Sequence, residues 1–128
     1  MTRAFPVLYA RDPERVAGFY RELLGFTETF RMPDEGAAGY IGLSLEDARL
    51  GVVDVAWPAQ QGITAGDHPR SELFIYVDDV DAMVEAVRAT GATVMAEPVD
   101  QPWGERVAYV ADPEGGPVAL AAPVGAAA

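Results

Sequence analysis

Two stretches of the chain carry apolar residues at the spacing of an amphipathic helix. Positions i, i+3, i+4 and i+7 are apolar in both, and the residues are Val16, Phe19, Tyr20, Leu23 and Leu24 in the first stretch and Val80, Met83, Val84 and Val87 in the second. An aspartate that can cap a helix precedes each stretch, and a glycine follows it, Gly25 or Gly91. The pattern therefore predicts two helices, each with one apolar stripe.

Short apolar runs typical of strands surround both predicted helices. The runs that precede the helices are Pro6 to Ala10 and Leu73 to Val77; those that follow are 27–31, 40–43 and 50–55 in the first half and 93–96, 106–110 and 118–121 in the second. The segment Tyr9 to Val16 also reappears in pattern 67 positions later, as Tyr76 to Met83. Each half thus has the order strand, helix, strand, strand, strand.

The repeat predicts how the chain is organised. We expect a first module over residues 1–57, a linker rich in Pro, Gly, Gln and Asp over 58–70, a second module over 71–124 and a disordered tail over 125–128. Residues 32–39 are expected to form a mobile hairpin loop. The predicted fold class is α+β, with the two βαβββ repeats forming a curved, cup-shaped mixed sheet that carries the helices on its outer face.

Residue alternation along the strands assigns side chains to the two faces of this sheet. Leu73, Ile75 and Val77 suit packing against a helix, so Glu72, Phe74 and Tyr76 should face the opposite side. Extended to the other strands, the rule describes a largely apolar and aromatic concave wall with one carboxylate, which suits a flat organic ligand. The candidate ligand-binding residues are Phe5, Val7, Tyr9, Tyr40, Val53, Glu72, Phe74, Tyr76, Trp103 and Tyr109.

The aromatic candidates on the strands compete with a simpler assignment. Aromatic strand residues such as Phe5, Phe74 and Tyr76 could equally well belong to the core. Trp103 differs, because the segment Gln101-Pro102-Trp103-Gly104 favours a turn from which a large side chain projects. We therefore expect Trp103 to serve a ligand or an interface.

Composition narrows the classes of function. The chain of 128 residues has no cysteine, which excludes disulfides and thiolate metal sites. Nine arginines and no lysine stand against 20 Asp and Glu, and the net charge of −11 disfavours nucleic-acid and anionic-membrane partners. The same charge suits a cationic small molecule, although acidic proteins are common. No apolar run approaches the roughly 18 residues of a membrane helix and no signal-peptide core is evident, so a cytoplasmic location is expected.

The motifs also carry a family likeness. The two βαβββ repeats, with Asp112-Pro113-Glu114-Gly115 before the last strand, resemble the vicinal oxygen chelate superfamily of glyoxalases, extradiol dioxygenases, fosfomycin-modifying enzymes and bleomycin resistance proteins. Within it, Pro6 to Asp12, Leu24-Gly25-Phe26 and Gln101 to Gly104 resemble the bleomycin resistance proteins most. That narrower resemblance implies antibiotic binding by a homodimer with its sites at the subunit interface.

Enzymes of this superfamily hold a divalent metal with four side chains, and the resemblance places these positions at Phe5, Gly51, Glu72 and Ala119. Only Glu72 can bind a metal, and one carboxylate cannot form the ligand set that such catalysis needs. The single histidine, His68, is interpreted as a solvated loop residue rather than a ligand. We therefore expect no metal, no other cofactor and no catalytic residue.

These observations lead to a hypothesis and its alternatives. The leading hypothesis is metal-independent binding and sequestration of a planar antibiotic or metabolite, with the negative charge suited to a cationic one. The main alternative is an enzyme of the same superfamily, a lyase, isomerase or dioxygenase acting on a small oxygenated substrate. A cofactor-free reaction with a buried Glu72 as general base, and a binder with a housekeeping or sensory role, also remain open.

Overall fold

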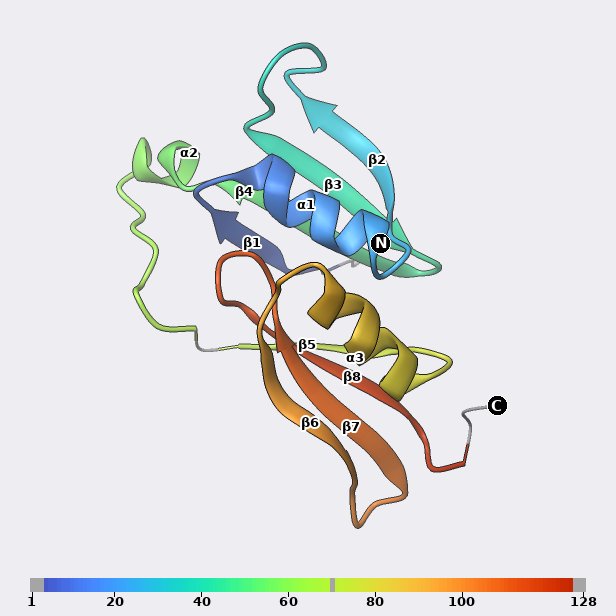
Figure 1. Cartoon of the computed structure of the whole chain (residues 1–128). Coiled ribbons are helices and arrows are strands. Elements are labelled where there is room, and N and C mark those ends of the chain that lie inside the picture. Colours follow the sequence, from blue (N-terminus) through green and yellow to red (C-terminus); the bar gives the residue numbers. More distant parts are fainter. Residues whose placement is uncertain (1–3, 70, 126–128) are drawn as a thin grey trace. The chain divides into compact units, whose positions relative to one another are not determined.

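The computed structural model describes residues 4–69 and 71–125, and these divide into two compact units that span Met1–Asp67 and His68–Ala128. Figure 1 shows the elements of each unit. The boundary between the units falls inside the segment expected to be a linker. Of the expected tail, residues 126–128 lie outside the described residues.

The first unit is a βαβββ repeat followed by one short helix. It contains β1 (Val7–Ala10), α1 (Pro13–Glu22), β2 (Thr27–Met32), β3 (Tyr40–Leu45), β4 (Ala48–Asp54) and α2 (Ala56–Ala59). The strand order is β1-β4-β3-β2, with β1 parallel to β4 and the other neighbours antiparallel.

The second unit repeats this architecture. It contains β5 (Leu73–Tyr76), α3 (Val80–Ala89), β6 (Val94–Asp100), β7 (Glu105–Ala111) and β8 (Pro117–Pro123), in the strand order β5-β8-β7-β6. Again the first strand is parallel to the last and the remaining pairs are antiparallel. The predicted α+β class and both βαβββ repeats are confirmed.

Both long helices begin and end as the sequence predicts. The Asp12 carboxylate accepts a hydrogen bond from the Arg15 backbone N–H (3.2 Å), and Asp79 accepts one from the Ala82 N–H (3.0 Å). Gly25 (φ +80°) and Gly91 (φ +85°) adopt the left-handed conformation after the helices, where a side chain would be strained.

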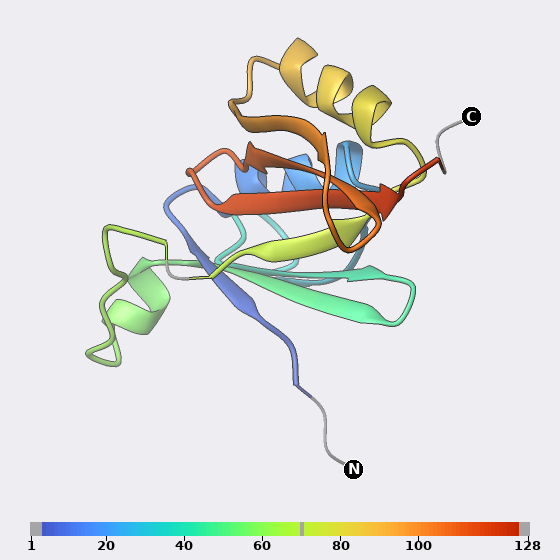
Figure 2. The ribbon, with the colours of Figure 1, turned by 90° about the horizontal axis from the view of Figure 1, so that it is seen from below.

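Each helix packs its apolar stripe against one face of the sheet of its own unit. In the first unit Val16, Phe19 and Tyr20 of α1 are buried, as are Ile41 and Val52 on β3 and β4. In the second, the buried residues of α3 are Val80, Val84 and Val87, and α3 contacts β6, β7 and β8. Figure 2 shows α3 lying along one face of its sheet. Each long helix therefore covers one face of its own sheet and does not cover the opposite face.

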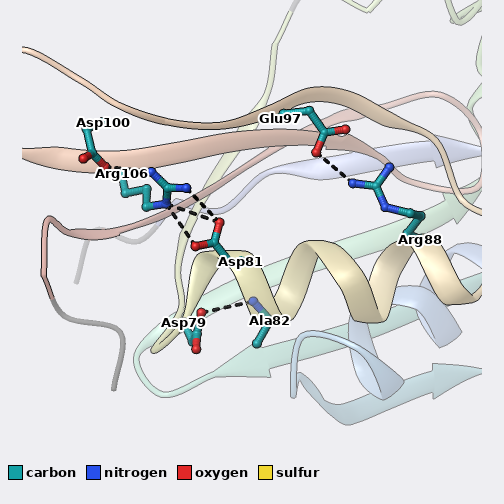
Figure 3. A network of polar contacts seen from close by, with 7 residues as sticks. All are labelled: Asp79, Asp81, Ala82, Arg88, Glu97, Asp100 and Arg106. Carbon is teal, nitrogen blue, oxygen red and sulfur yellow. Dashed lines mark hydrogen bonds and ion pairs between the residues drawn. The ribbon is translucent and has the colours of Figure 1, made fainter.

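Arginine side chains tie α3 to its sheet (Figure 3). Arg106 on β7 binds Asp81 at the start of α3 (3.1 Å) and Asp100 on β6 (3.0 Å). Arg88, at the end of α3, binds Glu97 on β6 (2.8 Å). The first unit has a similar arrangement, in which Arg31 and Arg21 share Glu28 on β2 and Arg31 also binds Glu14 on α1.

A short helix overlaps the start of the segment expected to be a linker. Residues 56–59 form α2, which the sequence analysis did not predict, because a four-residue helix is too short to show a periodic pattern. None of the helices in the described part of the chain is long and apolar enough to cross a membrane.

Candidate functional site

The face of the second sheet opposite α3 carries the aromatic side chains of β5. Phe74 is 43% exposed and Tyr76 is 61% exposed, whereas Ile75 between them is buried on the helix side. The predicted alternation along this strand is therefore confirmed. The two rings contact each other at a centroid distance of 5.5 Å, so they form one continuous aromatic surface.

Small residues on the neighbouring strand make room for these rings. Ala119 pairs with Phe74 and Ala121 pairs with Tyr76, and on the other side of β8 they pair with Tyr109 and Val107. Ala119, Ala121 and Val107 form a buried cluster against which Tyr109 packs. An alanine row flanked by aromatic side chains is thus the central feature of this face.

A carboxylate lies at one end of the same face. Glu105, the first residue of β7, is half-buried, and its Oε1 accepts a hydrogen bond of 2.8 Å from the indole Nε1–H of Trp103. Tyr76 and Val107 both pair with Ala121, and Glu105 lies two residues before Val107, so Tyr76 and Glu105 are on the same face of the sheet. Hydrogen bonding to Glu105 raises the pKa of Tyr76 above its ordinary value. Trp103 itself is 61% exposed in the turn before β7, as the sequence predicts.

Sequence reasoning missed Glu105. The sequence analysis expected Glu72 to be the carboxylate of this wall, but Glu72 precedes β5 and is exposed. The available signal was the position of Glu105 two residues after Trp103 on a turn that predicts a hairpin. Its proximity to Tyr76, 29 positions earlier in the chain, is visible only in the structure.

The first unit uses its open face differently. A Cβ atom added to Gly51 would lie 2.5 Å from the hydroxyl oxygen of Tyr40 and 3.0 Å from its Cζ atom, so the phenol of Tyr40 lies directly over this glycine. Phe30 contacts the Tyr40 ring at a centroid distance of 6.1 Å. Tyr40 therefore occupies the place where the side chain of a larger residue at position 51 would stand.

The remaining predicted residues on the strands of the first unit lie on the same side of its sheet. Val7 and Tyr9 are exposed on β1, and Val53, which pairs with both Tyr9 and Tyr40, is buried. Phe5 precedes β1 and is exposed. The ten candidates are thus five in the first unit (Phe5, Val7, Tyr9, Tyr40, Val53) and five in the second (Glu72, Phe74, Tyr76, Trp103, Tyr109).

A second tryptophan was not among the predicted residues. Trp57 lies on α2, and a Cβ atom added to Gly39 would collide with its indole ring. Gly39 also accepts a backbone hydrogen bond from Asp54 (2.7 Å). Trp57 thus packs the start of the expected linker against the end of the 33–39 loop.

The residues at the four positions that the family resemblance assigns to the metal ligands do not fit a metal. Phe5, Gly51 and Ala119 have no ligating atom in the side chain, and Glu72 alone is a carboxylate. His68 is exposed in the segment before β5. Among residues 4–69 and 71–125, no group of three or more His, Asp or Glu side chains is placed to hold a metal ion. The general-base hypothesis for Glu72 also required burial, which this exposed residue does not have.

The Asp112-Pro113-Glu114-Gly115 segment has a structural role. Asp112 is buried, and its Oδ1 atom accepts hydrogen bonds of 2.9 Å from the backbone N–H groups of Glu114 and Gly116. These bonds close the turn between β7 and β8. The segment therefore stabilises the turn that leads into β8.

Known proteins of similar sequence and structure agree with this description. The chain is 31% identical over 108 residues to a Mycobacterium bovis protein named "Putative glyoxylase CFP32", a match that covers 84% of this chain and 39% of the relative. The chain therefore spans well under half the length of that curated relative.

Solved structures share the fold. The crystal structure of TioX from Micromonospora sp. ML1 has a TM-score of 0.78 at 23% identity, covering 96% of this chain and 100% of that one. Lactoylglutathione lyase from Agrobacterium tumefaciens has a TM-score of 0.65 at 20% identity, covering 94% and 93% of the two chains. The family model described as the Glyoxalase/Bleomycin resistance protein/Dioxygenase superfamily matches residues 4–120. This match covers both βαβββ repeats, and the chain belongs to that superfamily.

Proposed function

We propose that this chain binds a planar small molecule, an antibiotic or a similar metabolite, and holds it without a metal and without changing it chemically. One observation carries the proposal. The positions that the family resemblance assigns to the metal ligands carry Phe5, Gly51 and Ala119 together with a single carboxylate, while exposed aromatic rings lie on the same strands.

The physical argument concerns what such a surface can bind. Phe74 and Tyr76 present two contacting rings, and Tyr109 packs on the alanine row between β5 and β7. Aromatic faces stack on planar heterocycles, and burial of a ring on both sides removes a large apolar area from water. The Tyr76 hydroxyl lies beside the Glu105 carboxylate, but its pKa is raised above the ordinary value, so it is held in the protonated form and the chemistry of this face favours binding over conversion.

The proposal includes an assembly and a location. We propose a homodimer with its ligand sites at the subunit interface, working in the cytoplasm; the family likeness motivates the dimer, and two-fold pairing is the commonest form of oligomer. Light scattering coupled to size-exclusion chromatography would measure the mass in solution. A monomer at all concentrations, with or without ligand, would remove the dimer from the proposal.

The experiment is a binding titration of the metal-stripped protein, followed by recovery of the ligand. Bleomycin and a panel of other planar or cationic antibiotics are titrated into the protein while tryptophan fluorescence is recorded. The bound compound is then recovered, and its molecular mass is measured by mass spectrometry. Saturable binding with the mass unchanged supports sequestration. A changed mass, or binding that returns only when a divalent metal is added, would contradict it.

A second candidate is an enzyme of the same superfamily. The relative named as a glyoxylase favours it, and the fold likeness to lactoylglutathione lyase suggests the reaction to assay first. Lactoylglutathione lyase activity is therefore measured with the metal-stripped protein and after addition of Zn²⁺, Ni²⁺, Mn²⁺ or Fe²⁺. Turnover that depends on one of these ions would favour the enzyme over the binding protein.

A further inference from the structure

Glu105 and Glu28 are both half-buried carboxylates on strands, but only Glu28 has cationic partners among the described residues. Glu28 is bound by Arg21 and Arg31, and the arginine next to Glu105 in sequence, Arg106, is bound by Asp81 and Asp100. Within the described part of the chain no arginine forms an ion pair with Glu105. Its partners, Trp103 and Tyr76, are both neutral donors.

A partly buried negative charge held only by neutral groups favours a cation beside it. The Trp103 N–H and the Tyr76 hydroxyl hold the carboxylate in place but leave its full charge uncompensated. The net charge of −11 adds a negative field around the whole chain. A cationic ligand at Glu105 would therefore be attracted both by this carboxylate and by the net negative charge of the chain.

The rings around Glu105 point to the same chemistry. The indole N–H of Trp103 donates to Glu105 in the plane of the ring, so this bond leaves the two faces of the indole available for a ligand. The Trp103 side chain is 61% exposed. Tyr76 is equally exposed, and Phe74 extends the aromatic surface from it. The faces of aromatic rings are negative and attract cations, most strongly those with a diffuse charge and apolar substituents.

We propose that Trp103, Glu105 and Tyr76 form a recognition site for a substituted ammonium group. Glu105 supplies the counter-charge, and the two aromatic rings contact the alkyl groups on the nitrogen. The site rests on the proposed binding function and makes it specific: the ligand joins a planar part to an alkylated cation. All three residues of this ammonium site belong to the second unit.

The test uses a matched pair of probes with the full-length chain. Phenyltrimethylammonium and its uncharged isostere tert-butylbenzene are titrated against Trp57→Phe protein, in which Trp103 is the single fluorophore. The variants are Glu105→Gln, which keeps a hydrogen-bond acceptor for Trp103 while removing the charge, and Glu72→Gln, which removes an exposed charge of the same unit.

We expect phenyltrimethylammonium to bind at least about tenfold more tightly than tert-butylbenzene, and Glu105→Gln to remove about that factor for the cation alone. Glu72→Gln should leave both affinities unchanged. The cation's affinity for the parent should also fall as salt is added, a result that needs no Glu105 variant. Equal affinities for the two probes, no binding of the cation, or equal losses in the two glutamine variants would overturn the site.

A second readout checks that Glu105 stands where the structure places it. Ultraviolet titration of the tyrosines should show the pKa of Tyr76 falling toward its ordinary value in Glu105→Gln, because the neighbouring negative charge is gone. An unchanged tyrosine titration would show that the two groups are not adjacent and would also overturn the site.

The two proposals fail in different ways. Antibiotics bound and recovered unchanged, with no discrimination between the paired probes, would refute the ammonium site and leave sequestration standing. A chemically altered antibiotic together with loss of cation binding in Glu105→Gln would refute sequestration and leave the ammonium site standing.

Discussion

The open faces of the two sheets have the same register and different side chains. One row reads Val7, Gly51, Gly42 and Phe30 in the first unit and Phe74, Ala119, Tyr109 and Ala96 in the second. The next row reads Tyr9, Val53, Tyr40 and Met32 against Tyr76, Ala121, Val107 and Val99. In the first unit the ring of Tyr40 lies over a glycine, whereas in the second alanines lie beside the exposed rings of Phe74 and Tyr76.

The comparison distinguishes the features that both units need to fold from those that would recognise a ligand. Both units keep a capped helix, a glycine after it and arginine contacts between helix and sheet. Only the second unit's face joins exposed rings to a carboxylate without an ionic partner among the described residues. One fold thus supports a face filled by its own tyrosine and a face suited to a ligand.

The largest effect is expected when a fully buried core residue of either unit is replaced with a smaller one. Ile41 on β3 and Leu120 on β8 are both fully buried, so replacing either with Ala should lower the free energy of unfolding by about 2–5 kcal/mol. Urea denaturation followed by circular dichroism measures the loss. As a surface control, Tyr76→Ala should cost far less, because Tyr76 is mostly exposed. A cost for Tyr76→Ala as large as that of Leu120→Ala would refute the division into core and binding face.

The next effect concerns ligand affinity and compares the replacement of Trp103 with that of Trp57. Trp103→Ala should weaken ligand binding by about 1–3 kcal/mol through lost stacking and burial, with little change in fold stability. Trp57→Ala should leave the affinity nearly unchanged, because Trp57 packs on Gly39 in the first unit. Isothermal calorimetry with a compound found in the antibiotic titration gives both values. The reverse ranking would assign recognition to the first unit.

A smaller effect tests the close packing over Gly51. Gly51→Ala should destabilise the chain by about 1 kcal/mol, because its methyl group forces the Tyr40 phenol to move. In a Tyr40→Ala background the same substitution should cost less, since the colliding ring is absent. Gly18→Ala is the matched control: the nearest atom to its new Cβ lies 3.5 Å away, and alanine favours helix, so no loss is expected. Equal costs for Gly51→Ala in both backgrounds would contradict the assigned contact.

The smallest effect distinguishes the ion pairs of the two units. The Arg31 hydrogen bond, with further help from Arg21, holds the pKa of Glu28 below its ordinary value of 4.5. Its contribution to stability is therefore complete above that value and is lost as the pH falls through the lower folded pKa. Glu28→Gln should remove up to about 1 kcal/mol near neutral pH and flatten the acid side of the stability profile. Glu97→Gln, whose side chain is 64% exposed, should change less; the opposite order would be inconsistent with the structure.

The sequence predicted most of the fold because its signals are local. Helix periodicity, the capping aspartates and the glycines that follow the helices each depend on a few neighbouring residues, and Asp79 and Gly91 behave as those signals indicate. The short helix α2 was missed because four residues are too few to show the periodicity of a helix, and the packing of Trp57 on Gly39 is a contact between positions 18 residues apart.

The site was harder to predict because it depends on register. The alternation along β5 correctly predicted that Phe74 and Tyr76 lie on the face opposite the helix. It could not show that Glu105, on a strand two places away in the sheet, lies beside Tyr76. Nor could it show that Tyr40 lies over Gly51, a contact set by the pairing of β3 with β4.

The most direct test of recognition by the second unit is a map of amide chemical-shift changes in isotopically labelled protein. Phenyltrimethylammonium is added to the metal-stripped chain, and the changes are assigned by residue. We predict that the largest changes cluster at Phe74, Tyr76, Trp103 and Glu105, with small ones around Tyr40 and Trp57. Changes centred on Tyr40 and Trp57, with none near Glu105, would contradict the account.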